Sequence, residues 1–97
     1  MPRNKRVETT TLTGDGAVNS NPGKVWAITI NSNGANVGTV VIKDGGSGGT
    51  SKWTLLVPAT AGSSSSVSFP EGLSCTTSIY ADITTVGSVC VAYTESA

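Results

Sequence analysis

The longest stretch of patterned apolar residues lies between Lys24 and Asp44, with the sequence KVWAITINSNGANVGTVVIKD. Two runs rich in β-branched residues flank the dipeptide Asn33-Gly34, and an Asn-Gly step between such runs is a strong signal of a β-hairpin with a type I′ turn. A turn at this step predicts the following pairs between the two runs: Ile30 with Val37, Ile28 with Thr39, and Trp26 with Val41. We therefore expect residues 24–44 to form two antiparallel strands of one sheet.

The second face of this predicted hairpin is apolar as well. It carries Val25, Ala27, Val40 and Ile42, and strands that are apolar on both faces belong inside a fold and not at its rim. Either a second sheet or a partner protein must cover this face. Because a chain of 97 residues supplies only a small core of its own, we expect the cover to come from an assembly.

Shorter alternations of apolar and polar residues predict further strands, and clusters of Gly, Pro, Ser and Asn predict the turns between them. The predicted strands outside the hairpin cover residues 7–13, 52–57, 67–69, 73–84 and 89–94. The predicted loops cover residues 14–23, 45–51 and 59–66, and Pro70-Glu71-Gly72 is a predicted turn. Residues 75–94 are expected to form a second hairpin. No window shows the 3.6-residue period of a helix.

The alternation also predicts which residues face inward from these strands. The expected inward residues are Trp53, Leu55, Val57, Leu73, Cys75, Thr77, Ile79, Ala81, Ile83, Val89, Val91 and Tyr93. About seven short strands separated by turns predict an all-β fold, a small antiparallel β-sandwich that is jelly-roll-like. We expect residues 1–22 to be an extended N-terminal arm with one strand and a loop, and residues 23–97 to be the sandwich domain.

Charge is scarce and unevenly placed. Charged residues are 12% of the chain and the formal net charge is zero. This suits a protein that sits close to copies of itself or to other subunits, and equally a soluble β domain with a neutral surface. Arg3, Lys5 and Arg6 form a basic arm, whereas the rest of the chain is mildly acidic. Together with Val7 they are the candidate partner-docking arm, and a frayed terminus is the alternative. Three basic residues, with no accompanying aromatic or glycine-rich pattern of the kind that binds nucleic acid, do not predict nucleic-acid binding.

The residue types that most catalytic and metal sites need are absent or scattered. The chain has no histidine, which excludes a His-based triad and a His-ligated metal. The segment Gly46–Lys52, GSGGTSK, is similar to a phosphate-binding loop, but Ser51 replaces the second glycine of that motif and Trp53 replaces its final Ser/Thr. We therefore interpret the segment as a hairpin tip. Asp44 and Glu71 could serve as a carboxylate pair only if the fold brought them together. We therefore expect a protein that is not an enzyme and that uses neither cofactor nor metal.

The remaining candidate chemistry lies in the cysteines and the aromatic residues. Cys75 and Cys90 are expected to be free thiols, because the basic start of the chain runs into VETTTLTG and not into the apolar segment of a secretory signal. No run is long enough to span a membrane. The aromatic residues, which could form a sugar-binding platform, are better explained by core packing. They are Trp26, Trp53, Tyr80 and Tyr93.

Several short motifs resemble small β-sandwich structural proteins of tailed bacteriophages, of the head decoration or cement type. The motifs are an apolar-x-Asp-Gly step at Ile42 to Gly45, a Phe-Pro-x-Gly-Leu turn at Phe69 to Leu73, and an apolar-Tyr pair at Ile79-Tyr80. The resemblance covers about residues 23 to 94, in the order GKVWAITI, VVIKDG, VSFPEGL, SIYADIT and VCVAYT. Ser78 departs from the glycine expected before the apolar-Tyr pair.

This resemblance implies a capsid decoration protein that bridges major capsid subunits and stabilises the head. Its implied partners are the major capsid protein and copies of itself, with a trimer as the favoured form, and neither membrane nor specific nucleic acid. Its implied location is the capsid surface, after assembly in the bacterial cytoplasm. The alternatives are a tail, baseplate or fibre module that binds host-surface glycan, and a host-directed regulatory protein that is absent from the particle.

Overall fold

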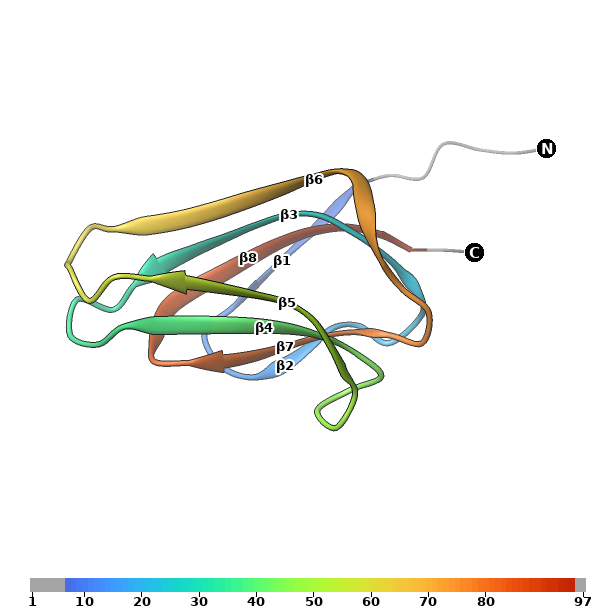
Figure 1. Cartoon of the computed structure of the whole chain (residues 1–97), viewed down its shortest axis with the longest axis horizontal. Helices are drawn as coiled ribbons and strands as arrows, with labels where there is room; N and C mark the ends of the chain where they lie inside the picture. The colour runs from blue at the N-terminus through green and yellow to red at the C-terminus, as the bar shows by residue number, and fades with distance from the viewer. Residues whose placement is uncertain (1–6, 96–97) are drawn as a thin grey trace.

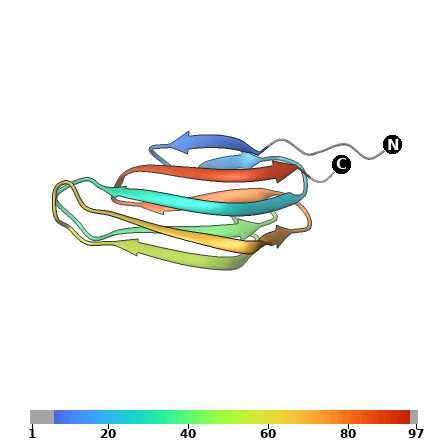
Figure 2. The same cartoon turned by 90° about the horizontal axis from the view of Figure 1, so that it is seen from above.

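The computed structural model describes residues 7–95, which form two antiparallel four-stranded sheets packed face to face (Figures 1 and 2). One sheet has the order β1-β8-β3-β6, formed by β1 (Glu8–Leu12), β8 (Val86–Glu95), β3 (Gly23–Ser32) and β6 (Ser64–Cys75). The other has the order β2-β7-β4-β5, formed by β2 (Gly16–Asn19), β7 (Ile79–Thr84), β4 (Gly38–Asp44) and β5 (Thr50–Val57). The predicted all-β sandwich is therefore confirmed, with eight strands instead of about seven.

The strand order is that of a jelly roll. The first strand pairs with the last, β2 with β7, β3 with β6 and β4 with β5, all antiparallel. The chain thus forms one long hairpin, folded at the glycine-rich tip in residues 45–49. Winding this hairpin over itself adds the pairs β3–β8 and β4–β7, which complete two sheets joined by Greek-key connections.

The predicted hairpin in residues 24–44 is wrong, because β3 and β4 lie in different sheets. A type I′ turn needs positive φ at both central residues, but of these two only Gly34 has one, at 83°. Asn33 instead accepts hydrogen bonds at Oδ1 from the N–H groups of Ala35 and Asn36, at 2.9 and 3.0 Å. This local turn leads the chain across the end of the sandwich from one sheet to the other.

A bulge in β3 explains which side chains enter the core. The register of β3 against β8 shifts between Val25 and Ala27, so Trp26 is an extra residue and the alternation changes phase there. Val25, Ile28 and Ile30 are consequently all fully buried. The sequence pattern assigned Val25 to the opposite face from the two isoleucines because a strict period of two leaves no room for such an insertion.

The other sheet of the same chain covers the apolar face that we expected an assembly to cover. Val25, Val40 and Ile42 all have no exposed surface and belong to one core between the two sheets. This expectation was therefore wrong. The core of the described residues consists of Val18, Val25, Ile28, Ile30, Val40, Ile42, Val57, Cys75, Ile79, Ala81, Val86, Val89 and Val91. Burial of these side chains inside one chain makes the sandwich a self-contained module.

Other predictions were also wrong. The strand predicted over residues 73–84 is broken between β6 and β7, which lie in different sheets, and Thr77 in the break is exposed and not inward. The predicted loop in residues 14–23 contains β2, because Val18 is apolar enough to enter the core while its polar neighbours face solvent. The predicted turn at residues 70–72 lies inside β6. Residues 75–94 do not form a hairpin, because β7 and β8 lie in different sheets and Thr85 makes the crossing with a φ of 51°. The inward positions predicted for Val89 and Val91 are confirmed.

Candidate functional site

The predicted docking arm lies at the start of the chain, and its basic residues Arg3, Lys5 and Arg6 are outside the described residues. Val7 is described, and 55% of its surface is exposed immediately before β1. Within the described part of the chain β1 pairs only with β8. Its outer edge therefore presents backbone N–H and C=O groups that another strand could pair with.

Four connections between the sheets lie at one end of the sandwich, and they are residues 13–15, 33–37, 58–63 and 85. The first carries Asp15, whose carboxylate accepts a hydrogen bond from the Ile83 N–H group. The other three carry no charged residue. Ser32 donates a backbone hydrogen bond to the carbonyl oxygen of Ser63 at 2.9 Å, and the Thr85 hydroxyl donates to the carbonyl oxygen of Val37 at 2.6 Å. These bonds hold the three connections together as one surface.

We call this surface the uncharged end, because the strands that lead to it carry no Asp, Glu, Lys or Arg over long stretches. The uncharged stretches are residues 25–42, 53–70 and 83–94. Two large apolar side chains remain exposed near this end, Val37 at 55% and Leu56 at 56%. Both belong to the same corner, because Thr39 pairs with Leu56 and Gly38 pairs with Val57. Val37 directly precedes Gly38.

A second feature is a four-residue bulge in β6, which we call the FPEG bulge and which consists of Phe69–Gly72. Val25 pairs with Leu73 and Ala27 pairs with Ser68, so only Trp26 on β3 stands opposite the four bulge residues. The bulge therefore leaves the β3 ladder over these four residues.

The FPEG bulge borders a shallow, open cavity of about 380 Å³, lined by Phe69, Pro70, Glu71 and Gly72. The rings of Trp53, from the edge strand β5, and Phe69 pack perpendicular to each other, with ring centroids 5.1 Å apart and an interplanar angle of 87°. Trp53 shares the face of Leu55 and Val57, as the pattern predicted, but 40% of its surface is exposed. It is therefore the aromatic residue that core packing explains least.

Gly72 fixes the shape of this bulge. It has a φ of +80°, and a Cβ there would lie 2.7 Å from Lys24 Cδ and 3.3 Å from Trp26 Cη2, so both space and backbone conformation require glycine. The Lys24 ammonium lies 5.8 Å from the centroid of the Trp26 ring and donates to the Glu71 carbonyl oxygen at 3.4 Å. Trp26 Nε1 donates to the Thr94 hydroxyl at 2.9 Å. The far side of the bulge is thus held by two side chains of β3.

Asp44 is held in a structural role. Its carboxylate accepts bonds from Thr76 N and Oγ1, Thr77 N and Ser78 N, at 2.9, 3.0, 2.8 and 3.3 Å. These bonds, led by that from the Thr76 backbone, lower the pKa of Asp44 to about 2. A carboxylate engaged in this way does not act as a general acid or base near neutral pH, and no contact among the described residues joins it to Glu71.

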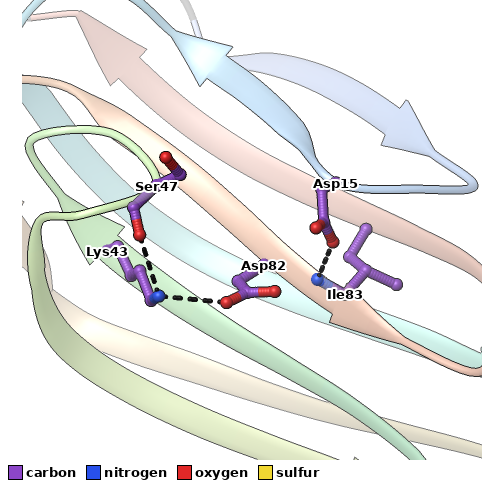
Figure 3. A network of polar contacts seen from close by, with 5 residues as sticks. All are labelled: Asp15, Lys43, Ser47, Asp82 and Ile83. Carbon is purple, nitrogen blue, oxygen red and sulfur yellow. Dashed lines mark hydrogen bonds and ion pairs between the residues drawn. The ribbon is translucent and has the colours of Figure 1, made fainter.

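Polar contacts on the outer face of the second sheet also fix strands in place (Figure 3). Lys43 Nζ lies 3.0 Å from Asp82 Oδ2 and donates to the Ser47 carbonyl oxygen at 3.0 Å. Asp15 Oδ1 accepts from the backbone N–H of Ile83 at 2.6 Å. The first contact ties the hairpin tip to β4 and β7, and the second extends the short β2–β7 ladder by one side-chain bond.

The two cysteines are free thiols in different surroundings. Cys75 is buried between the sheets, and burial, followed by the charge of Asp44, raises the pKa of its thiol. Cys90 is partly exposed on the outer face of the first sheet, between Thr11 and Thr29 on the neighbouring strands. A raised pKa makes Cys75 a poor nucleophile at neutral pH.

The glycine-rich tip lacks the geometry of a phosphate-binding loop. The tip in residues 45–49 joins two strands, and its Gly49 N–H donates to the Gly46 carbonyl oxygen at 2.9 Å, so the helix N-terminus that a phosphate-binding loop needs does not follow it. Among residues 7–95, no group of three or more Cys, Asp or Glu is arranged to hold a metal ion. No helix in the same residues could cross a membrane.

Comparison with models of known protein families, with curated proteins and with solved structures finds no match to this chain. The candidate sites therefore stand on the geometry described above. Sequence reasoning missed the uncharged end, because its three connections are far apart in the chain and meet only in the jelly roll. It identified the Phe69–Leu73 motif but gave it the role of a turn.

Proposed function

We propose that this chain is a non-enzymatic structural subunit of a tailed-bacteriophage particle, and specifically a decoration protein on the outside of the head. It would bridge neighbouring major capsid subunits and bury surface across their boundaries, so that the pressure of packaged DNA acts against more interface. Jelly rolls occur in viral capsid and lectin domains. That likeness is one of architecture alone, and the resemblance of the short motifs supports the same class.

The observation that carries this proposal is the uncharged end. Charged residues are depleted at the centres of protein interfaces, and exposed apolar groups on a small soluble domain mark interaction surfaces. Val37 and Leu56 lie at a corner whose surrounding strand segments carry no charge. We therefore assign this end to the contact with the capsid, with Val37 and Leu56 as its apolar centre.

The opposite end supports a second contact. Glu8 pairs with Tyr93 and Leu12 with Val89, so β1 begins at the end away from Thr85. The basic arm, with Arg3, Lys5 and Arg6, precedes this strand and would dock on an acidic neighbour, while the free edge of β1 would add to a neighbour's sheet. Copies of the same chain, with a trimer as the favoured form, and the major capsid protein are the proposed neighbours.

The test is binding to capsid shells of the encoding phage that lack this protein, measured by co-sedimentation. The double variant Val37→Asp/Leu56→Asp should lose binding, because two charges would enter an apolar contact without partners. Ser74→Asp places a charge on the exposed part of β6 near the other end and is the matched control. Equal binding by all three proteins, with folding verified by circular dichroism, would contradict the assignment.

A tail, baseplate or fibre module is the second candidate, and the exposed Trp53 favours it, since a sugar-binding module needs an accessible aromatic ring. Sedimentation separates the two functions, because a tail module would bind purified tails and leave the shells unoccupied. A host-directed regulatory protein would bind neither structure.

A further inference from the structure

We infer that the FPEG bulge and Trp53 form a binding site for neutral saccharides, of the class of unbranched hexopyranose oligomers. This inference goes beyond the proposed contact with the capsid and does not depend on it. The FPEG bulge lies opposite Trp26, toward the other end of β3 from Ser32 and the uncharged end. Both surfaces can therefore be occupied at the same time.

The first argument is the combination of a concave surface with an accessible aromatic ring. Phe69 and Pro70 give the 380 Å³ cavity an apolar wall, and Trp53 stands against Phe69 with 40% of its surface exposed. Binding sites for small molecules are typically concave and apolar, with a few polar groups that orient the ligand. The C–H face of a hexopyranose is the flat apolar surface that suits a tryptophan ring.

The second argument is the set of hydrogen-bonding groups that the bulge carries. Glu71 lies in the cavity wall, and its carboxylate has neither a hydrogen bond nor an ion pair among the described residues. The bulge backbone has also left the β3 ladder, so its N–H and C=O groups are not paired with β3. Sugar hydroxyl groups both donate and accept, and this mixture of partners suits them.

Charge argues for a neutral ligand. The cavity wall carries one ionisable side chain, Glu71, and a lone carboxylate repels phosphorylated or acidic polymers. The nearest opposite charge that contacts the bulge, the Lys24 ammonium, is already directed to the Glu71 carbonyl oxygen and the Trp26 ring. A neutral oligosaccharide can pack its C–H face on the apolar wall and donate a hydroxyl hydrogen bond to the Glu71 carboxylate.

The test is a titration of the whole chain with five neutral hexaoses, monitored by isothermal calorimetry and by tryptophan fluorescence. The probes are maltohexaose, cellohexaose, laminarihexaose, mannohexaose and N-acetylchitohexaose. At least one should bind, and Trp53→Ala should weaken that binding by about tenfold or more, because it removes the ring on which the sugar stacks. Trp53→Phe should retain part of the affinity.

Two further variants separate the site from general effects on folding. Glu71→Gln removes the charge without changing the size of the side chain and should weaken binding by about fivefold or more, because hydrogen bonds to charged groups are stronger than neutral ones. Thr54→Ala, at an exposed position of the same strand as Trp53 but on its other face, should bind like the original chain. Absence of binding to every probe at 10 mM sugar, or unchanged binding by both Trp53→Ala and Glu71→Gln, would overturn the inference.

Discussion

Asp44 and Thr76 are joined by two hydrogen bonds at a single carboxylate oxygen. Thr76 N and Thr76 Oγ1 lie 2.9 and 3.0 Å from Asp44 Oδ2. Asp44 ends β4 in one sheet, and Thr76 follows the last residue of β6 in the other sheet. This carboxylate therefore fastens the crossing between β6 and β7 to the end of the glycine-rich hairpin.

Replacement of Asp44 by alanine should destabilise the fold by about 1.5–3 kcal/mol, the range for hydrogen bonds to a charged group. The loss follows because the N–H groups of Thr76 and Thr77 would no longer have their carboxylate acceptor. Urea unfolding measures the change. Asp82→Ala is the control, since it removes only a partly exposed ion pair with Lys43, which contributes about 0–1 kcal/mol. An equal effect of both substitutions would contradict the role of Asp44.

The same carboxylate predicts a dependence of stability on acid pH. The pKa of Asp44 is about 2 in the fold against an ordinary value of 3.8, so the ionised form is the one that the folded state favours. Its contribution is complete above the unfolded pKa and is lost as pH falls through about 4 toward 2. Thermal unfolding between pH 5 and pH 2 should therefore show a decrease that is smaller in Asp44→Asn. Identical pH profiles would argue against the lowered pKa.

Close packing at the uncharged end should make Gly38 intolerant of any side chain. A Cβ there would lie 2.5 Å from Val86 Cγ1, 2.9 Å from Val57 Cγ1 and 3.1 Å from the Thr85 carbonyl oxygen. Gly38→Ala should cost about 1–3 kcal/mol, as other overpacked sites do. Gly48→Ala, at a position with nothing within 4 Å, should be nearly neutral. The comparison of unfolding midpoints checks this, and a neutral Gly38→Ala would show that the end is loosely packed.

The two thiols should react at different rates with Ellman's reagent at pH 8. Cys90 is partly exposed, whereas Cys75 is buried and burial raises the pKa of its thiol, so the thiolate of Cys75 is both scarce and inaccessible. We expect one thiol to react in the folded protein and the second only after unfolding. Cys90→Ser should abolish the fast reaction and Cys75→Ser should leave it unchanged. Loss of the fast phase in Cys75→Ser instead would reverse the assignment.

The sequence alone predicted the fold class, because alternation of apolar residues marks strands wherever one face is buried. The predicted inward residues Ile79, Ala81 and Val91 illustrate this, since all three are fully buried. Strand pairing was much less predictable. Asn33-Gly34 looked like a local hairpin turn, but the jelly roll pairs strands by their distance from the tip at residues 45–49, a relationship between segments far apart in the chain.

Sites were harder to predict than strands. A bulge at Trp26 changes which residues of β3 face the core, and no local sequence pattern predicts the extra residue. The Phe69–Leu73 motif was visible, but its role depended on Trp53, which reaches it from the other sheet. The apolar residues at the uncharged end were also visible in the sequence, and the pairing of β4 with β5 within one sheet brings Val37 close to Leu56.

The most direct test of the proposed function is the copy number of this chain in purified phage particles, determined by quantitative mass spectrometry against the major capsid protein. A head decoration protein should be present in numbers comparable to those of the major capsid protein, and cryo-electron microscopy should place it on the outer capsid surface with its uncharged end toward the shell. A handful of copies per particle, density confined to the tail, or absence from the particle would contradict the account.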